Sequence, residues 1–347
     1  MRVLITGHTG FKGSWLSLLL AERGHEVSGI ALDPLAGGLY EAGDISAVME
    51  NDVRLDIRDA TGLAQAVADI DAELVFHLAA QPLVRESYLD PRATFDTNVT
   101  GTMNVLQALE GARSTRAAVI ITTDKVYRNV GRLAGYTEDE ALGGDDPYSA
   151  SKAMADLLTQ SWVTSFPGVP TAIARAGNVI GGGDVSKDRL LVDLINGFAT
   201  SSPARIRYPD AVRPWQHVLD CLSGYLALAD ALLDGRGAGA WNFGPEPESF
   251  QTVRQIADIA VSHWGADAGW VDDRGEHPHE AALLTLDSSK AQRDLGWSNR
   301  LPFPLSLEWT LDWYRSVLDG SEPRAVASDQ IARFAAIDPQ AAWQRGF

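Results

Sequence analysis

The sequence predicts an α/β protein in which a doubly wound parallel sheet is followed by a smaller C-terminal α/β lobe. Short apolar runs of strand length alternate with segments of helical periodicity as far as about residue 180. A glycine-rich turn links the first strand to the first helix, and beyond residue 180 the alternation loosens. We therefore expect a first domain over residues 1–180, to which residues 212–248 return, and a substrate-binding domain that occupies mainly residues 181–347.

The composition is that of an ordinary globular protein, with 45% apolar and 22% charged residues. The net charge of -17, from 29 basic and 46 acidic residues, argues against nucleic-acid binding, because no excess of cations is available to release counterions from phosphates. The single cysteine, Cys221, excludes an internal disulfide and a cysteine zinc cluster and favours a reducing compartment; we expect it to pack within a helix. No basic leader precedes the first strand and no window approaches about 18 uninterrupted apolar residues, so we expect a cytoplasmic protein without membrane contact.

The first strand-to-helix connection predicts a dinucleotide site. Residues 2–6 form a continuously apolar strand of the kind buried in a parallel sheet, and the run GHTGFKG follows from Gly7 to Gly13. Residues 14–23 have helical periodicity and end at Gly24, which suits a left-handed position after a helix. Glycines here allow a tight turn and a close approach of the backbone to a pyrophosphate at the helix N-terminus. The sheet is therefore expected to be of the Rossmann type; a merely tight loop is the alternative.

The second and third strands bear on the choice of dinucleotide. Residues 26–32 form the second strand, but the position where an acidic residue often binds the adenosine ribose is Ala31, and the nearest carboxylate is Asp33. No Arg or Lys follows there to meet a 2'-phosphate, so we favour NAD over NADP. Val53 to Ile57 alternate as a third strand. Asp56 can meet the adenine amino group, or can simply be a solvated charge.

The fourth and fifth strands end in residues suited to a ligand site. The run Glu73–Gln81 contains His77, which we expect to be a core histidine with satisfied hydrogen bonds. A helix over residues 91–110 follows, and a fifth strand over residues 118–123 ends in Thr122-Thr123-Asp124-Lys125. Ligands bind at the carboxyl ends of central parallel strands. A solvated turn is the competing interpretation of these polar residues.

Tyr148 and Lys152 stand four residues apart at the start of the next predicted helix, so that both project from one helical face. A free phenol is a poor base at neutral pH, whereas a nearby ammonium favours its ionised form. Tyr148 can then accept a proton. Taken alone the spacing also fits an exposed tyrosine and a solvated lysine, and its weight comes from the motifs before it.

The second half contains a local excess of cations. A sixth strand over residues 171–176 precedes the expected start of the second lobe near residue 180. The stretch from residue 187 to residue 213 contains five cations, Lys187, Arg189, Arg205, Arg207 and Arg213, against the carboxylates Asp188, Asp193 and Asp210. We interpret it as a phosphate clamp, with a solvated face as the alternative. A helix to about residue 233 and a strand over residues 240–243, which returns to the main sheet, follow.

The last hundred residues are expected to add mainly helices. We predict helices over residues 252–264 and 305–318, a strand near residues 283–286, a helix capped by Asp287, and a surface extension beyond Gly320. His277, His279 and Glu280 suggest a metal site, which we reject because Pro278 prevents a regular helix there and no further ligand set is apparent.

These motifs, in this order, resemble the extended short-chain dehydrogenases/reductases that act on nucleotide sugars, and more narrowly the bacterial CDP-glucose 4,6-dehydratases. The resemblance covers nearly the whole chain, through GHTGFKGSWLS, FHLAAQPLVRESY, TTDKVY, GGDDPYSASKA, RAGNVIGGGD, RPWQHVL and HPHEA. The glycine turn and Tyr-x-x-x-Lys indicate only the superfamily. Asp-Lys after the fifth strand, with RAGNVIGGGD and RPWQHV, indicates the CDP-glucose branch, since related dTDP-glucose dehydratases carry Asp-Glu at that strand end.

The resemblance implies roles for five residues. Thr123 and Tyr148 hold the sugar 4-hydroxyl, Tyr148 removes its proton, and the C4 hydride passes to NAD, while Lys152 binds the nicotinamide ribose and lowers the tyrosine pKa. Water then leaves C6 with Asp124 as the proton donor, and the hydride returns to C6. Lys125 aligns with the residue that removes the C5 proton in the dTDP branch; either it does so here as a neutral amine, or it only stabilises the enolate.

The resemblance also implies binding residues. For NAD they are Gly7, Gly10, Phe11, Lys12, Gly13, Asp56, Ile57, Leu78, Ala79, Ala80 and Asn98, with Tyr148 and Lys152. For CDP-glucose they are Gln81 and Arg85 at the sugar, and Asn178, Lys187, Arg189, Arg207, Arg213, Gln216 and His217 at the nucleotide. The helices over residues 91–110 and 148–165 resemble a pair that forms a dimer interface, so we expect a homodimer or a dimer of dimers.

Three alternatives remain at this point. A nucleotide-sugar 4-epimerase shares the glycine turn, Tyr148 and Lys152 but needs no acid at C6, and a dehydratase for another sugar nucleotide shares the chemistry. A catalytically silent nucleotide-binding module on the same fold is the non-enzymatic alternative, because fold does not fix function.

Overall fold

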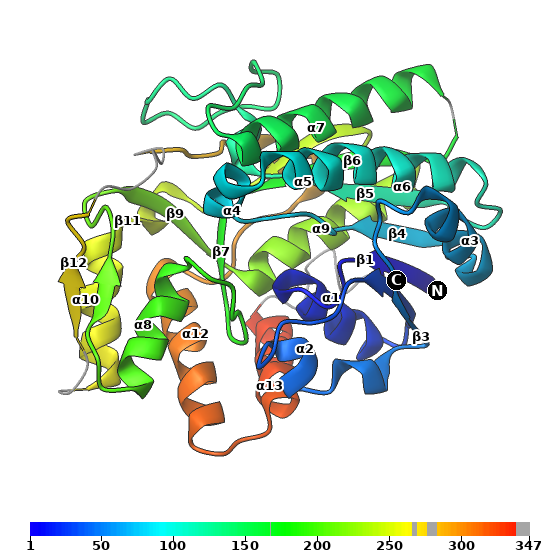
Figure 1. The fold of residues 1–347 in the computed structure, drawn as a ribbon. Helices are drawn as coiled ribbons and strands as arrows, with labels where there is room; N and C mark the ends of the chain where they lie inside the picture. The colour runs from blue at the N-terminus through cyan, green and yellow to red at the C-terminus, as the bar shows by residue number, and fades with distance from the viewer. Residues whose placement is uncertain (167, 266–268, 276–282, 338–347) are drawn as a thin grey trace.

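The computed structural model describes residues 1–166, 168–265, 269–275 and 283–337, and its main element is a seven-stranded parallel sheet (Figure 1). The strand order is β10-β6-β5-β4-β1-β2-β3, which confirms the predicted doubly wound α/β class. The strands are β1 (Arg2–Thr6), β2 (Glu26–Ala31), β3 (Asn51–Arg54), β4 (Leu74–His77), β5 (Ala117–Ile121), β6 (Thr171–Ala176) and β10 (Gly239–Phe243). As expected, β10 returns from the second half of the chain, with Trp241 opposite Ala174 of β6.

Helices cover both faces of this sheet because alternate strand residues point to opposite sides. Val3 and Ile5 pack toward α1 (Phe11–Ala21) and α9 (Val218–Leu233), where Cys221 is fully buried as predicted. Leu4 and Val75 pack on the other side, toward α3 (Ala60–Ile70) and α6 (Gly101–Glu110). The helix α7 (Pro147–Ser165) lies beside α6 on that side (Figure 1). Both layers therefore leave the carboxyl edge of the sheet free for a site.

Two local predictions shift in the structure. The third strand ends at Arg54 instead of Ile57, because the Asp56 carboxylate accepts a hydrogen bond from the Arg58 amide and turns the chain. The helix predicted over residues 91–110 is three consecutive segments, α5 (Pro91–Phe95), a π-helical turn (Asp96–Thr100) and α6. The wide turn contains Asn98, whose buried amide donates to the Gln81 carbonyl and to Ser151 Oγ.

The smaller lobe contains two further sheets. One consists of β7 (Asn178–Ile180), β9 (Val212–His217) and β11 (Phe250–Thr252), and the other of β8 (Ala204–Ile206) and β12 (Trp270–Asp272). Its helices are α8 (Leu190–Ala199), α10 (Val253–Trp264), α11 (Ser289–Leu295), α12 (Phe303–Leu318) and α13 (Pro323–Ile337). Short elements elsewhere are α2 (Leu39–Ala42), α4 (Val84–Leu89) and the 3-10 turns at Ile45–Val48, Asp124–Val126 and Pro247–Ser249.

The C-terminal part corrects two expectations. Residues 323–337, part of the predicted surface extension beyond Gly320, instead form α13, which buries Ala327, Ile331 and Phe334 against the core. The strand predicted near residues 283–286 is reduced to one bridge between Leu286 and Tyr136. No helix among the described residues is long and apolar enough to cross a membrane. His277, His279 and Glu280 lie outside the described residues.

Candidate active site

The glycine turn has the close packing that a dinucleotide site needs. Gly7 has a φ of 79°, and a Cβ there would lie 2.7 Å from the Ala79 amide nitrogen. A Cβ on Gly13 would lie 2.1 Å from the Gly7 carbonyl oxygen. Gly10 begins α1 without a side-chain cap, so the first amides of the helix remain available to an anion. These residues, with Leu78 to Ala80 after β4, fit a bound dinucleotide diphosphate.

A cation lies at the end of β2, where none was expected from the neighbouring sequence. Arg54 comes from the adjacent strand, opposite Ala31, and its Nε is 3.5 Å from Asp33. Asp52 pairs with the same guanidinium and also accepts from His8 Nε2 at 2.7 Å. The charge of Arg54 is therefore already balanced by two carboxylates.

Lys12 reaches from the glycine turn toward α9 at the wall of the cavity. Its Nζ donates to the Tyr225 hydroxyl at 3.1 Å, and burial lowers its pKa. This buried ammonium lies close enough to Lys152 for its charge to lower the Lys152 pKa. Two lysines therefore share one buried region below the carboxyl edge of the sheet.

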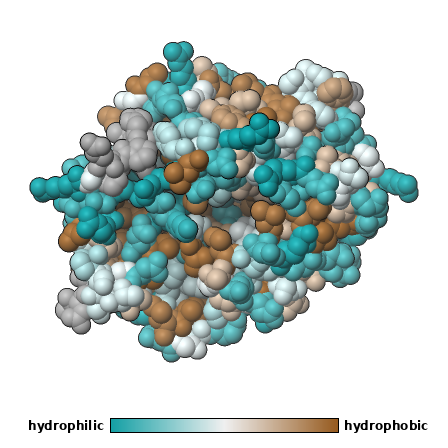
Figure 2. Space-filling view, in the orientation of Figure 1, coloured by the Kyte–Doolittle hydropathy of each residue, from teal (hydrophilic) through white to brown (hydrophobic). Residues whose placement is uncertain are grey.

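A cavity of about 270 Å³ opens at that edge, between the main sheet and the smaller lobe. The face shown in Figure 2 is hollowed near its centre, with hydrophilic and apolar residues around the hollow. Segments far apart in the sequence line the cavity, and the structure brings together there eleven of the residues predicted for the site: Phe11, Lys12, Arg85, Thr123, Asp124, Lys125, Tyr148, Asn178, Arg189, Arg207 and Arg213.

Thr123, Asp124 and Tyr148 form the polar centre of the cavity. The Thr123 hydroxyl donates to Asp124 Oδ1 at 2.8 Å, and Tyr148 lines the same cavity close enough to Thr123 for this side chain to act on its pKa. Burial raises the pKa of Asp124, while Lys125, Thr123 and Arg213 act in the opposite direction. A carboxyl group that retains its proton more readily than usual thus lies beside a phenol.

The Tyr148–Lys152 pair differs from the expected arrangement. Burial raises the pKa of Tyr148 to about 12, although the nearby Thr123 side chain and the charge of Arg189 act to lower it. Lys152 donates instead to the Ile121 carbonyl at 2.8 Å, and burial, followed by the charge of Lys12, lowers its pKa to about 7. In this structure the pKa of Tyr148 is therefore raised, while the Lys152 ammonium is hydrogen-bonded to the strand.

The outer part of the cavity contains arginines from three elements around one carboxylate. Arg85 of α4 and Arg207, which follows β8, each donate to Asp188 Oδ1 at 2.7 Å. Asp188 has a φ of 61° and a lowered pKa, because these hydrogen bonds and charges outweigh its burial. Arg189 faces the same cavity, and its Nε has no hydrogen-bond partner among the described residues. Positive charge thus gathers where the sequence predicted a phosphate clamp.

Two predicted substrate residues lie on β9 but do not line the cavity. Gln216 is buried and donates to Asn299 Oδ1 at 2.8 Å, on the opposite face of the strand from Arg213 and Trp215, which line the cavity. His217 is fully buried, and its Nδ1 accepts from the Leu219 amide at the start of α9. Neither side chain belongs to this site.

Gln81 and Lys187 also fall outside the cavity lining. The Gln81 amide donates to the Leu83 carbonyl in the turn before α4 and to Thr94 Oγ1 in α5, and Pro82 to Arg85 line the cavity in its place. Lys187 is exposed, whereas the next two residues face inward. His77, as expected, is a core histidine, bonded to Thr6 and Thr102.

Several lining residues were not predicted. In the sequence analysis, Asp188 was counted only as a charge opposing the cations. Its position next to Arg189, a predicted substrate residue, was the signal that could have placed it in the site. Gly177 lies so close to the acid that a Cβ there would be 2.8 Å from Asp124 Oδ2. Apolar and aromatic residues complete the wall: Leu83, Val84 and Trp215 lie within the matching motifs without having been singled out, and Tyr208, Val253 and Tyr314 lie outside them.

Comparisons with known proteins agree with this geometry. A model described as the NAD dependent epimerase/dehydratase family matches residues 3–244. A CDP-glucose 4,6-dehydratase of Salmonella typhimurium is 44% identical over 344 residues, covering 96% of each chain. A dTDP-glucose 4,6-dehydratase of Mycolicibacterium smegmatis is 31% identical and covers 91% of this chain and 94% of its own. The crystal structure of a Streptomyces venezuelae dTDP-glucose 4,6-dehydratase, with NAD and TYD bound, has a TM-score of 0.79 at 27% identity and covers 93% of this chain and 100% of that one.

Proposed function

The chain belongs to the NAD dependent epimerase/dehydratase family, and on this premise we propose that it is a CDP-glucose 4,6-dehydratase. The reaction converts CDP-glucose to CDP-4-keto-6-deoxyglucose and water. The similarity to the Salmonella typhimurium protein along almost the whole of both chains supports the choice of substrate. One observation of the site carries the choice of reaction: a buried carboxyl, Asp124, with a raised pKa lies next to Thr123 and Tyr148 in one cavity.

The side chains divide the reaction into a proton removal and an elimination. Bound NAD+ would accept the hydride from C4, and the NADH so formed would return it to C6. Thr123 orients the 4-hydroxyl and Tyr148 takes its proton. The pKa of Tyr148 is raised to about 12 in this structure, so it must fall when NAD and substrate bind if Tyr148 is to act as the base. Asp124 gives its proton to the leaving 6-hydroxyl. An epimerase needs no such acid, so this residue favours dehydration.

The role of Asp124 is tested by Asp124→Asn. The amide cannot protonate the leaving hydroxyl, so we expect slow elimination after an unimpaired oxidation, with NADH and the 4-keto-glucose intermediate detected by rapid quench. If neither accumulates, and a deuterium label at C4 shows that oxidation has not become rate-limiting, Asp124 is not the acid.

Lys125 lines the cavity next to Asp124 and is proposed to remove the C5 proton or to stabilise the enolate. Lys125→Ala tests the base role through exchange of the C5 hydrogen with deuterated solvent. Loss of exchange supports the base. Exchange at the wild-type rate excludes it.

The arginines of the outer cavity are proposed to bind the nucleotide diphosphate and the cytidine. Arg189, Arg207 and Arg213, with Asn178, come from different elements but face one cavity, which supports a shared ligand, and Arg85 in the same lining is proposed to contact the sugar. Asp188 accepts one hydrogen bond from each of Arg85 and Arg207, which holds both side chains in the lining of the cavity.

The function is tested by incubating the purified protein with NAD and, separately, with CDP-, dTDP-, GDP- and UDP-glucose. Loss of one water by mass spectrometry and the alkaline absorbance of a 4-keto sugar report dehydration. Dehydration confined to CDP-glucose is the expected result, and dehydration of another nucleotide sugar would change the substrate. Interconversion of 4-hydroxyl epimers would indicate an epimerase, and binding without turnover a silent module.

A homodimer, alone or as half of a dimer of dimers, is proposed through the outer surfaces of α6 and α7. These adjacent helices expose Met103, Met154, Leu157, Val163 and Phe166. Leu157→Glu should shift the mass measured by light scattering toward the monomer, whereas Ile259→Glu, at an exposed residue of α10, should not. A monomeric wild-type protein would contradict the proposal.

A further inference from the structure

The turn that carries Thr123, Asp124 and Lys125 is poorly held by its own hydrogen bonds. The Lys125 amide lies 3.4 Å from Thr123 Oγ1, the Val126 amide 3.4 Å from the Thr123 carbonyl, and the Tyr127 amide 3.3 Å from the Asp124 carbonyl. Bonds of this length are long for N–H to oxygen and contribute little. The position of the turn must therefore be set from outside.

Shorter bonds to one buried ion pair hold the residues on both sides of the turn. Asp156 accepts two hydrogen bonds from Arg175, each of 2.8 Å, and both side chains are fully buried. Before the turn, Thr122 Oγ1 donates to Asp156 Oδ2 at 3.0 Å. After it, the Tyr127 hydroxyl accepts from Arg175 at 2.7 Å and donates to Asn242 Oδ1 at 2.7 Å. One ion pair thus fixes both ends.

The same ion pair is tied to the other half of the site. Asp156 lies one helical turn after Lys152 on α7, and its charge acts to raise the Lys152 pKa. Lys152 in turn donates to Ile121, immediately before Thr122. The helix that carries Tyr148 and the strand end that carries Asp124 are therefore joined through Asp156.

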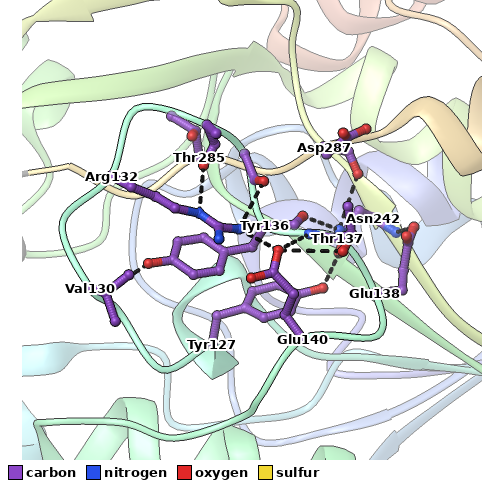
Figure 3. Close-up of polar contacts among 12 residues, drawn as sticks. Tyr127, Val130, Arg132, Tyr136, Thr137, Glu138, Glu140, Asn242, Thr285 and Asp287 are labelled. Atoms are coloured by element: carbon purple, nitrogen blue, oxygen red, sulfur yellow. Dashed lines mark hydrogen bonds and ion pairs between the residues drawn. The ribbon is translucent and has the colours of Figure 1, made fainter.

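Tyr127 is itself fixed from its outer side, as Figure 3 shows. Its ring stacks on Tyr136 with the centroids 5.3 Å apart and the planes at 17°. Arg132 lies over the ring of Tyr136 and forms an ion pair with Glu140. An antiparallel bridge between Tyr127 and Leu142 closes the loop that contains these residues. Asn242 of β10 donates to the Tyr136 and Asp287 carbonyls.

We propose that Asp156, Arg175 and Tyr127 form a buried anchor that sets the position of the Thr123–Lys125 turn relative to Tyr148. They are positioning residues, since none of the three is among the described residues that line the cavity. A buried ion pair is weak evidence for stability, because well-packed apolar residues can replace one at no loss. Precise placement of reacting groups is the property that such a pair supplies here, and a displacement of about 1 Å can cost on the order of 100-fold in rate.

The anchor is tested by two matched tyrosine variants. Tyr127→Phe keeps the ring stack but removes the bonds to Arg175 and Asn242, while Tyr136→Phe removes two bonds on the far side of the same stack, to Val130 and Asn129. With NAD and CDP-glucose, we expect Tyr127→Phe to lower kcat at least about ten-fold with little change in KM, because misplacement affects the reacting groups and not the binding arginines. Tyr136→Phe should keep the wild-type kcat.

A second pair approaches the turn from its other end. Thr122→Val removes the bond to Asp156, and Thr159→Val removes a comparable buried bond within α7, to the Ala155 carbonyl. Only the first should lower kcat. Equal effects within either pair, or a loss confined to KM, would overturn the anchor.

Amide hydrogen exchange provides a readout that does not need turnover. Tyr127→Phe and Thr122→Val should speed exchange at Lys125, Val126 and Tyr127, and the two control variants should not. The catalytic part of the test rests on the proposed function, whereas this part does not. A wild-type protein without dehydratase activity would refute the function and leave exchange to decide, and unchanged exchange in both test variants would refute the anchor.

Discussion

Replacing Gly13 by alanine tests whether the glycine turn is held by backbone packing. The new Cβ would lie 2.1 Å from the Gly7 carbonyl oxygen and 2.7 Å from the His8 Cα, and no side chain can rotate to relieve either contact. Helix α1 must then withdraw from the turn by about 1 Å to restore ordinary contact. Overpacking of this kind costs about 1–3 kcal/mol, and we expect about 3 kcal/mol because both obstacles are backbone. That is a large part of the roughly 5–15 kcal/mol by which a domain is stable.

Gly10→Ala is the matched control in the same turn. A Cβ there meets its nearest atom at 3.4 Å, and the φ of -79° suits any residue, so the expected cost is below about 1 kcal/mol. Urea unfolding of both variants without NAD, followed by circular dichroism, gives the midpoint and the m-value. Equal midpoints for the two variants, or a lower midpoint for Gly10→Ala, would show that the close approach of α1 to the turn is not a requirement of the fold.

Four buried groups give further expected outcomes. Tyr148→Phe should abolish NADH formation from CDP-glucose; NADH at the wild-type rate would exclude Tyr148 as the base. Burial lowers the pKa of Lys152 from 10.5 to about 7. Between pH 7 and pH 10.5 the unfolded chain therefore binds more protons than the folded protein, and stability rises with pH over that range. Lys152→Met should therefore stabilise the protein more near pH 6 than near pH 9, and equal Tm shifts at both would contradict this. Burial, then Lys152, lowers the pKa of His77 from 6.5 to about 3, so stability falls as the pH drops below 6.5, by up to about 1.4 kcal/mol per pH unit. His77→Gln should flatten that acid slope in urea titrations, and an unchanged slope would count against it. Gly182→Ala places a Cβ 2.0 Å from the Trp313 ring and should lower the free energy of unfolding by about 2 kcal/mol. An unchanged midpoint in urea unfolding would refute this.

Most of the fold could be predicted because its signals are local. Apolar runs marked the central strands to within a residue or two, and Gly24 does adopt the left-handed conformation after the first helix. Residues 323–337 were misjudged because α13 has apolar residues on a narrow stripe within a polar segment, and only the core shows where that stripe packs. The end of β3 was misplaced because the Asp56 turn competes with an alternating pattern that continues past it.

The candidate site was predictable where a motif places a residue at a strand end or a helix start. Thr123, Asp124 and Tyr148 meet in one cavity for that reason. Arg54 was missed because it reaches the end of β2 across a strand pairing, which adjacency in sequence does not reveal. His217 was assigned to the substrate because it follows a motif, yet the start of α9 uses its ring as a cap. The hydrogen-bond partners that a side chain finds in the folded protein, which the sequence does not reveal, decide whether a motif residue faces the site.

The place of β10 in the main sheet has a consequence for how the chain is made. The strand beside it, β6, leaves the ribosome before α8, β9 and α9, so at roughly 5–20 residues per second its edge waits several seconds for a partner. During that interval the nascent chain presents an apolar, unpaired strand edge, which is a template for pairing with other chains. A fragment that stops near residue 180 would keep that edge permanently. The sheet of the first half is therefore completed only by translation of the second.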